Sequence, residues 1–466
     1  MQKFQKFTFE SQSFDIENLV ASFSYSFDEK VFFTEKIDFK SEWFKTIKNL
    51  NPDIIENLLF HASIALGISY YKLYPTQELI IKNWFLDASQ IKFWKKFYIN
   101  GLWEYFFRNN ISPNKVLKFV NTLKANKIKK YTVKSDVANV WIWWWKDSLV
   151  SIDIVKKSKT KFVTSTFGKN YLIHNVVSQK IWKPRLIMNR YMDPKLFEMN
   201  KEWYYNGHVP ISGIIAFVLS ISSYLYDHKY LVMSNEKSAD FENTILDWVK
   251  INHQYSKSFE FESDFWNYVK KYISTNRHYF SLLRWMYEIQ IAKLFSKQKK
   301  YFDTFSSCNT NFKLLEENKR KVIARIEKTK QSKSLSTSER RCNHCPKCAF
   351  VYSITRPFIS GSETLKIFWE ELYDIEDLKS LFSELLWISG IKPFECVWTN
   401  EEVIMAMYLQ YKKLKKSWKK IPFILKLFEE KVLPNMTEKD FAKLEKKLFK
   451  IYPSKNIPQK FLKFLK

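Results

Sequence analysis

The sequence predicts an α/β protein with an N-terminal α+β region (1–130), a sheet-forming domain (131–363) and a helical C-terminal region with a Lys-rich tail (364–466). Two observations predict this fold class. From residue 131 onward, short apolar segments alternate with segments of helical period, which favours a parallel sheet covered on both faces. Polar residues that can carry chemistry directly follow several of the apolar segments. Such residues would lie beyond the carboxyl ends of the strands, where parallel sheets bind ligands.

The N-terminal region is expected to hold short strands followed by mainly helical chain over 50–130. Alternating apolar residues predict the strands, and Asn51-Pro52-Asp53 and Ser112-Pro113 are typical helix starts. The predicted elements are strands over 16–20 and 30–33 and helices over 54–66 and from 112 to about 124.

The central and C-terminal elements follow from the same patterns. The predicted strands are 137–142, 161–164, 185–188 and 230–234, and the predicted helices are 148–157 and 211–226. Further along, we expect a charged helix running into a Lys/Ser-rich loop over 312–340 and a largely helical stretch over 364–415.

Composition limits the class of protein. The chain has 466 residues and a formal net charge of +28. Its most apolar segment, 211–225, is interrupted by polar residues, and residues 1–10 lack the apolar core of a signal peptide, so we expect a cytoplasmic protein without a membrane span. The positive charge indicates either a polyanionic partner or the codon bias of an AT-rich genome.

The glycine and tryptophan counts are unusual. The chain has 7 glycines and 17 tryptophans, whereas about 7% glycine is typical. Several tryptophans stand where turns favour glycine, above all in the run Trp141-Ile142-Trp143-Trp144-Trp145. We therefore hypothesise that UGA codons of this gene mean glycine and were translated as tryptophan. The alternative is a chain that is truly rich in tryptophan.

The first candidate site is the segment from Val140 to Ser148, between a predicted strand and a predicted helix. Read with glycine at the tryptophan positions, it becomes Val-Gly-Ile-Gly-Gly-Gly-Lys-Asp-Ser. A strand-to-helix turn without side chains lets backbone N–H groups approach phosphate oxygens, and the helix N-terminus adds partial positive charge. Read literally, the indoles would fill this space, and the segment would be an aromatic core strand.

Two further segments carry polar candidates. His208, in Asn206-Gly207-His208-Val209-Pro210, is suited to a general base or an anion ligand, although a histidine before an apolar helix is often a packing residue. Asn235 and Glu236 follow the predicted strand at 230–234, where substrate-binding groups are expected. An ordinary polar loop is the alternative.

Cysteines form the last candidate site. Cys342, Cys345 and Cys348 have the spacing of ligands to one Zn²⁺, with Cys308 or His344 as the fourth ligand. Iron–sulfur ligation, a redox pair and buried free thiols are the alternatives. A separate turn at 392–399 contains the fifth cysteine, Cys396.

The loop at 143–148 resembles the Ser-Gly-Gly-x-Asp-Ser loop of the ATP pyrophosphatases. Together with the other segments, it makes the chain similar to the UDP-N-acetylmuramoyl-L-alanyl-L-glutamate epimerase family. The matching segments run in order across about 131–413; they are the presumed Gly-Gly-Gly-Lys-Asp-Ser, 206–210, 234–239, 305–309, 342–350 and 392–399. Weaker similarity lies at 61–71 and 101–110.

The resemblance implies a PP-loop (HUP-like) parallel sheet and ATP-dependent inversion of the terminal L-Glu of UDP-MurNAc-L-Ala-L-Glu, through an acyl adenylate, with release of AMP and pyrophosphate. It implies ATP and Mg²⁺ at the loop, where Trp143, Trp144, Trp145, Lys146, Asp147 and Ser148 would bind them. From their own positions, we expect His208, Asn235 and Glu236 to handle substrate or proton. From their spacing, we expect Cys308, Cys342, Cys345 and Cys348 to bind a structural metal such as Zn²⁺.

Three spatial expectations follow. Residues 143–146 should form a strand-to-helix turn at the carboxyl edge of the sheet, the four cysteines should converge, and the loop should line one basic cleft with His208 and Glu236. Two other functions are carried as alternatives. One is a PP-loop enzyme that modifies tRNA by adenylating a base, and the other is a zinc-stabilised RNA-binding protein without catalysis.

Overall fold

A computed structural model describes most of the chain. The described residues are 3–112, 117–125, 128–143, 145–170, 172–202, 204–241, 244–246, 249–252, 254–306, 308, 341–388, 399–452 and 455–465. The predictions for Trp144, for segment 312–340 and for nearly all of the turn at 392–399 fall outside these residues.

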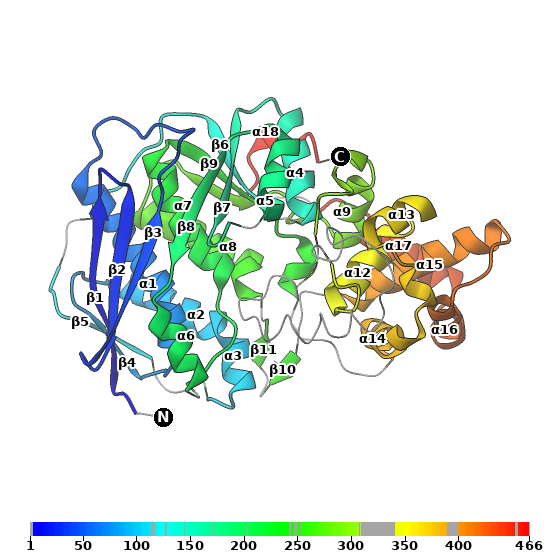
Figure 1. The fold of residues 1–466 in the computed structure, drawn as a ribbon, viewed down its shortest axis with the longest axis horizontal. Helices are drawn as coiled ribbons and strands as arrows, with labels where there is room; N and C mark the ends of the chain where they lie inside the picture. Colours follow the sequence, from blue (N-terminus) through cyan, green and yellow to red (C-terminus); the bar gives the residue numbers. More distant parts are fainter. Residues whose placement is uncertain are drawn as a thin grey trace.

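Within the described chain, ten strands form one mixed sheet in the order β12-β9-β6-β7-β8-β3-β2-β1-β4-β5 (Figure 1). Its N-terminal half contains β1 (Lys6–Asp15), β2 (Val20–Phe27), β3 (Val31–Asp38), β4 (Glu78–Ile81) and β5 (Lys118–Asn121). β1, β2 and β3 are antiparallel, and β4 and β5 extend the sheet parallel to β1. β3 pairs antiparallel with β8, so both halves share one hydrogen-bonded sheet.

The central half of the sheet is parallel, as predicted. It contains β6 (Val137–Trp141), β7 (Phe162–Phe167), β8 (Arg185–Tyr191), β9 (His228–Met233) and β12 (His278–Ser281). The chain enters in the middle at β6, adds β7 and β8 on one side, and then adds β9 and β12 on the other. The strand order therefore reverses between β6 and β9, and parallel sheets bind ligands at the carboxyl end of this reversal point.

Helices cover both faces of the sheet, because apolar side chains of the central strands point alternately to one face and to the other. Trp141 and Leu231 point into one core with α1 (Pro52–Tyr71), α7 (Ile211–Leu225) and α8 (Phe259–Tyr272). Val140 and Val232 point into the other core with α4 (Lys146–Lys157), α5 (Leu172–Ile181) and α9 (Glu288–Phe295). The sequence predicted α1, α4 and α7, with small differences at their ends.

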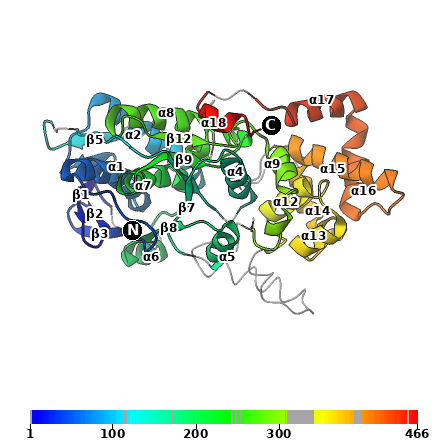
Figure 2. The same ribbon diagram turned by 90° about the horizontal axis from the view of Figure 1, so that it is seen from above.

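The C-terminal region is helical, as expected, and lies next to α9, at the end of the molecule away from β1 to β5 (Figure 1). It contains α12 (Pro346–Thr355), α13 (Gly361–Phe368), α14 (Lys379–Leu385), α15 (Asn400–Lys416), α16 (Phe423–Lys431), α17 (Glu438–Leu448) and α18 (Gln459–Leu462). The chain then returns to the sheet, and Figure 2 shows α18 near α4. Lys460 of α18 lies 3.8 Å from the centroid of the Tyr230 ring.

Shorter elements complete the described chain. α2 (Ala88–Gly101) and α3 (Trp103–Arg108) follow β4, and α6 (Pro194–Lys201) follows β8. A small hairpin pairs β10 (Thr244–Leu246) with β11 (Val249–Ile251). No helix in the described part of the chain is both long and apolar enough to cross a membrane.

Two sequence predictions are wrong. Residues 16–19 form the turn between β1 and β2, because the Asp15 carboxylate accepts the backbone N–H groups of Glu17 and Asn18 and so bends the chain. The helix predicted from 112 to about 124 is instead strand β5 over its described middle. Its backbone pairs with β4, and this long-range pairing overrides the local Ser-Pro signal.

Tryptophans occupy an unusual share of the left-handed backbone positions. Twelve described non-glycine residues have positive φ, and four of them are tryptophans. They are Trp182, Trp369, Trp387 and Trp418, with φ of 57°, 49°, 64° and 54°. Each stands at or just beyond the C-terminal end of a helix. A bulky side chain is strained in this conformation, and glycine is the residue that helices use there.

The hydrogen bonds around Trp418 define the helix end. Its N–H donates to the Lys415 carbonyl at 3.2 Å, and the Lys419 N–H donates to the Leu414 carbonyl at 3.1 Å. This pair of bonds is the Schellman motif, whose left-handed position usually holds glycine. The Trp418 side chain is 97% exposed, so packing does not compensate for the strain.

We expect Trp418→Gly to raise the free energy of unfolding of the tryptophan-containing chain by about 1 kcal/mol, because it relieves a left-handed residue that has no packing role. Trp94→Gly is the matched control. The Trp94 ring is fully buried and its Nε1–H donates to the Tyr268 hydroxyl at 3.0 Å, so this change should cost about 3 kcal/mol or more. Urea unfolding measures both. A destabilised Trp418→Gly variant would contradict the interpretation.

Candidate active site

The segment predicted to bind phosphate forms the turn between β6 and α4, as expected. β6 ends at Trp141, and α4 begins at Lys146. The Ser148 hydroxyl donates to the carbonyls of Trp143 and Trp145 at 2.6 and 2.9 Å, which folds the turn back on the helix. Trp145 is the N-cap residue and supplies no side-chain acceptor. The first amides of α4 therefore lack the side-chain cap that α1 and α2 have.

The turn differs from the expectation in one respect. Neither Trp143 nor Trp145 has positive φ; the φ of Trp145 is −90°. Their indole rings lie 6.5 Å apart between centroids, and Trp141 lies 5.6 Å from Trp143. These aromatic rings line the same cavity as Asp147 and Ser148 in the first turn of α4.

A buried ion cluster lies behind the turn. Lys146 pairs with Asp147 at 2.6 Å and with Glu288 at the start of α9. Glu288 also accepts a bond of 3.1 Å from Lys347 of α12. The side chains of Lys146, Glu288 and Lys347 are at most 2% exposed. Burying charges is costly unless they pair, and here two ammonium groups share one carboxylate.

The cluster sets the protonation of its members. Burial alone would raise the pKa of Glu288, but the ammonium groups of Lys146 and Lys347 lower it to about 2. Burial by itself would lower the pKa of Lys146, yet Asp147 and Glu288 hold it above its usual value. Burial and the charge of Glu288 raise the pKa of Asp147. Lys146 and Glu288 are therefore charged near neutral pH.

Asn235 and Glu236 follow β9, on the other side of the strand-order reversal. The Asn235 amide donates to the Ser281 hydroxyl at 3.0 Å, and Arg284 donates to the Glu236 carbonyl at 3.3 Å. Burial, followed by the charge of Glu288, raises the pKa of Glu236 to about 8. The Glu236 Oε1 atom is buried without a hydrogen-bond partner among the described residues, which is unusual for a carboxyl oxygen.

His208 lies in the loop just before α7, and its side chain lines the same cavity as Glu236. Its Nδ1 atom lies 3.7 Å from the Glu104 carboxylate. The preceding residues are fixed by the buried Lys72, whose Nζ donates to the Asn206 side chain at 2.6 Å and to the Gly207 carbonyl at 3.1 Å. The loop that carries His208 is therefore anchored to α1.

These groups line one cavity of about 170 Å³, which we call the central cavity. Its lining residues are Trp141, Trp143, Trp145, Asp147, Ser148, His208, Ile211, Ser212, Met233, Ser234, Asn235, Glu236, Gln254, Ser256 and Lys257. The structure thus brings the loop, His208 and Glu236 together, as expected. The expected basic lining is wrong, since Lys257 is the one lysine or arginine among these lining residues, which also include the carboxyls of Asp147 and Glu236. Lys146 and Lys347 lie buried behind.

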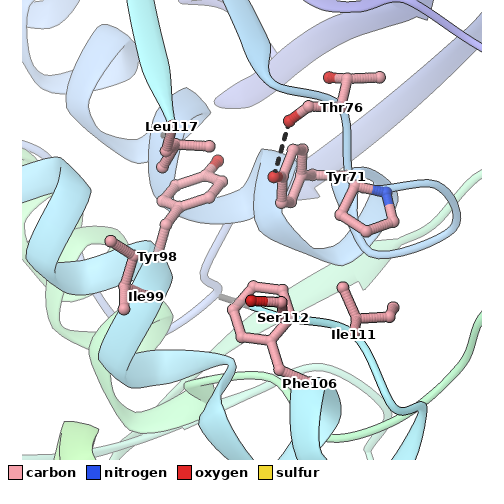
Figure 3. Close-up of a pocket in the computed structure, with 9 residues that line it drawn as sticks. Tyr71, Thr76, Tyr98, Ile99, Phe106, Ile111, Ser112 and Leu117 are labelled. Atoms are coloured by element: carbon pink, nitrogen blue, oxygen red, sulfur yellow. Dashed lines mark hydrogen bonds between the residues drawn. The ribbon is translucent and has the colours of Figure 1, made fainter. Parts of the chain in front are cut away.

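A second hollow has a different character. It is lined by Tyr71, Tyr98, Phe106 and other mostly apolar residues (Figure 3), and its volume of about 20 Å³ holds about one water molecule. Two of its lining residues are joined by the bond of 2.9 Å from the Tyr71 hydroxyl to the Thr76 carbonyl. Its described lining residues include none of those that line the central cavity, and no Asp, Glu, His, Lys or Arg.

The four predicted cysteines converge. The sulfur atoms of Cys308, Cys342, Cys345 and Cys348 all lie within 4.8 Å of one another, and all four residues are buried. The prediction that Cys308 rather than His344 completes the cluster agrees with this geometry.

Sequence reasoning did not assign roles to Glu288 and Lys347. Glu288 lies in the first turn of the helix that follows β12, the next parallel strand, so its position at the active edge could have been inferred from the alternation of strands and helices. Lys347 stands between two cysteines, and no local sequence pattern indicates that its side chain pairs with Glu288 of α9.

These features define an α/β protein with a cavity where the strand order of a parallel sheet reverses, the place where such sheets commonly bind ligands. Family models described as the MurL N-terminal domain and the MurL C-terminal domain match residues 1–282 and 304–442. The chain therefore belongs to the MurL family.

Three relatives are named UDP-N-acetyl-alpha-D-muramoyl-L-alanyl-L-glutamate epimerase. The protein of Xanthomonas oryzae pv. oryzae is 28% identical over 93% of this chain and 91% of its own length. That of a Micromonospora species is 30% identical over 88% and 87%, and that of Salinispora tropica is 29% identical over 92% and 89%. The similarity thus spans both halves of the chain.

The pKa values of Glu236 and Glu288 predict that removing the two charges has opposite effects on the stability of the fold. The folded-state pKa of Glu236, about 8, exceeds the ordinary value of 4.5, so the folded state binds this proton more tightly and stability falls as pH rises from about 4.5 to 8. Glu236→Gln mimics the protonated form. We expect it to be more stable than the parent by at least about 1 kcal/mol at pH 8, with a smaller difference at pH 5.

Glu288→Gln is the matched variant. The lowered pKa of Glu288 contributes stability that is present above pH 4.5 and lost as pH falls toward 2. Its removal should therefore destabilise the protein at pH 8, by about 3 kcal/mol, because two buried ammonium groups lose their partner. Urea unfolding at pH 5 and pH 8 measures both variants. Equal destabilisation by both variants at pH 8 would refute the assignment.

Proposed function

We propose that this protein is an epimerase that inverts the terminal L-Glu of UDP-MurNAc-L-Ala-L-Glu to D-Glu during peptidoglycan precursor synthesis, using ATP and releasing AMP and pyrophosphate. The observation that carries the proposal is the alignment of relatives with this epimerase name along about nine tenths of the chain. It favours the epimerase over the tRNA-modifying alternative. A nucleotide-linked substrate also suits the cytoplasmic location expected from the sequence.

The need for ATP follows from the chemistry of the substrate. Removing the α-proton of a glutamate whose α-carboxylate is ionised places a second negative charge beside the first. Transfer of AMP to the carboxylate forms an acyl adenylate and releases pyrophosphate, which removes that charge and makes the α-proton acidic enough for a positioned base. Hydrolysis of the adenylate then yields AMP and the inverted amino acid, and it makes the cycle irreversible.

The β6–α4 turn suits the pyrophosphate end of ATP, as in a PP-loop of HUP-like type. The α4 N-terminus carries no side-chain cap, so its amides can donate to phosphate oxygens. Ser148 would bind pyrophosphate once its hydroxyl leaves the turn carbonyls. Lys146 would neutralise phosphate charge, and Asp147 would hold Mg²⁺, which supplies charge neutralisation between phosphate groups.

We propose that Trp143, Trp144 and Trp145 are glycines in the native protein. The central cavity of about 170 Å³ is smaller than the 300 Å³ or more of ordinary ligand pockets, and Trp143 and Trp145 are among its lining residues. The four left-handed tryptophans at helix ends support the same recoding independently. Peptide masses of the native protein test it, and tryptophan found at these three positions would contradict it.

Inversion needs a proton removed from one face of the α-carbon and returned to the other. We assign these steps to Glu236 and His208, which reach the central cavity from the end of β9 and the start of α7. The raised pKa of Glu236 lies near the range that favours acid–base catalysis. Asn235, beside it, would bind a substrate carbonyl or carboxylate.

The two half-reactions can be separated by substitution. Asp147→Asn should abolish substrate-dependent pyrophosphate release, because Mg²⁺ loses a charged ligand. His208→Ala and Glu236→Gln should each reduce epimerisation by about 10²-fold or more while pyrophosphate release continues. Glu260→Gln, an exposed carboxyl on α8, is the control and should change neither activity. The assays use the chain produced with glycine at UGA.

The outcomes distinguish the roles. If His208→Ala stops both activities together, His208 binds ATP or supports the fold. If it changes neither, the proton passes through another group and the assignment of His208 is wrong. The same reasoning applies to Glu236.

A further inference from the structure

We propose that Cys308, Cys342, Cys345 and Cys348 bind one Zn²⁺ ion and that this ion positions Lys347 in the site described above. All four sulfur atoms lie within 4.8 Å of one another. Zn–S bonds of about 2.3 Å in a tetrahedron place the sulfurs about 3.8 Å apart, so the cluster needs little contraction around one ion. In a cubane iron–sulfur cluster each thiolate binds a different iron, which requires a wider arrangement.

The backbone between the first two cysteines has the shape of a metal-binding turn. Asn343 adopts φ of 56°, which turns the chain so that Cys342 and Cys345 face the same point. Its side-chain amide donates to the Phe368 carbonyl and, at 3.1 Å, to the Glu370 carboxylate. These bonds hold the turn in place, as the groups around a metal site commonly do.

The next two cysteines lie at the start of α12. Cys345 is the N-cap residue, and its sulfur accepts the backbone N–H of Cys348 at 3.4 Å. An N–H bond to sulfur and the positive end of a helix both favour the thiolate over the thiol. The donor set is therefore suited to a soft divalent ion, for which a tetrahedral site of four sulfurs is typical.

Arg341 joins the two chain segments that supply the ligands. Its guanidinium is fully buried and donates to the Phe305 carbonyl at 2.6 Å and to the Ile367 carbonyl at 2.8 Å. Phe305 precedes Cys308, and Arg341 directly precedes Cys342. The bond to Phe305 thus ties the segment that leads to Cys308 to the segment that begins at Cys342.

The consequence for catalysis rests on the proposed function. Lys347 lies between two ligands, Cys345 and Cys348, in the first turn of α12, and its Nζ atom is held 3.1 Å from Glu288. Glu288 in turn pairs with Lys146 of the phosphate-binding turn. A zinc ion that fixes the start of α12 therefore also fixes the position of the Lys347 ammonium group. This group contributes to the charge balance behind the β6–α4 turn.

Metal analysis of the full chain tests the site without reference to activity. We expect one zinc per chain, released as four thiols are titrated with a mercurial, and a tetrahedral thiolate spectrum when Co²⁺ replaces zinc. Cys308→Ser should lower the zinc content at least tenfold, Cys308→His should retain zinc, and Cys396→Ser, which changes the fifth cysteine, is the control. Absence of metal, iron in place of zinc, or zinc retained by Cys308→Ser would overturn the proposal. If Cys308→Ser does not fold, the Co²⁺ spectrum of the parent chain tests the site, and a spectrum without tetrahedral thiolate ligation would overturn it.

ATP binding tests the link to Lys347. Loss of zinc in Cys308→Ser and the substitution Lys347→Met should each weaken ATP binding about tenfold, and Cys308→His should restore it. If Cys308→Ser lacks zinc but binds ATP like the parent, the positioning role is wrong although the zinc site stands. If the parent itself does not bind ATP, the proposed function fails while the zinc stoichiometry remains unaffected.

Discussion

The buried pairing of Glu288 with Lys146 and Lys347 is the interaction on which the arrangement of the site depends. Lys146 begins α4, Glu288 begins α9 and Lys347 lies in the first turn of α12. These helices belong to different segments of the chain, and their N-termini meet behind the central cavity. Because an unpaired charge at this depth would be strongly destabilising, the three helix starts are held in one relative position.

This constraint connects the sheet to its chemistry. The central cavity lies at the carboxyl edge of the sheet, where the strand order reverses between β6 and β9. The ion cluster of Lys146, Glu288 and Lys347 lies buried behind this cavity. Burial and the negative charge of Glu288 together raise the pKa of Glu236 to about 8. The same cluster thus steadies the turn proposed to bind phosphate and adjusts the carboxyl proposed to carry the proton.

The sequence predicted the elements whose signals are local. The apolar segments of β6 and β9, the periodic face of α4 and the spacing of Cys342, Cys345 and Cys348 each lie within about ten residues, so their positions could be inferred before the structure. Glu288 and Lys347 could not be assigned in this way, because their role arises from contact between distant segments. β5 was missed for the same reason, since its pairing with β4 overrides its own helix-start signal.

The tryptophans show a different limit of prediction. Composition led to the hypothesis that some tryptophans stand for glycine, but it did not identify which. The backbone separates them: Trp418 and Trp387 end helices in left-handed conformation, whereas Trp94 packs at 4.7 Å from the Phe217 ring and is part of the core. Trp143 and Trp145 of the β6–α4 turn lack positive φ, and the case for glycine there rests on the space that phosphate requires.

The central claim is that activation by ATP makes the glutamate α-proton removable at this site. Incubating the protein with UDP-MurNAc-L-Ala-L-Glu in D₂O, with and without ATP and Mg²⁺, tests it most directly. We predict that deuterium enters the α-position of the terminal glutamate only when ATP is present, with one pyrophosphate released for each inverted residue. Deuterium incorporation without ATP, or inversion without exchange of the α-proton, would contradict the account.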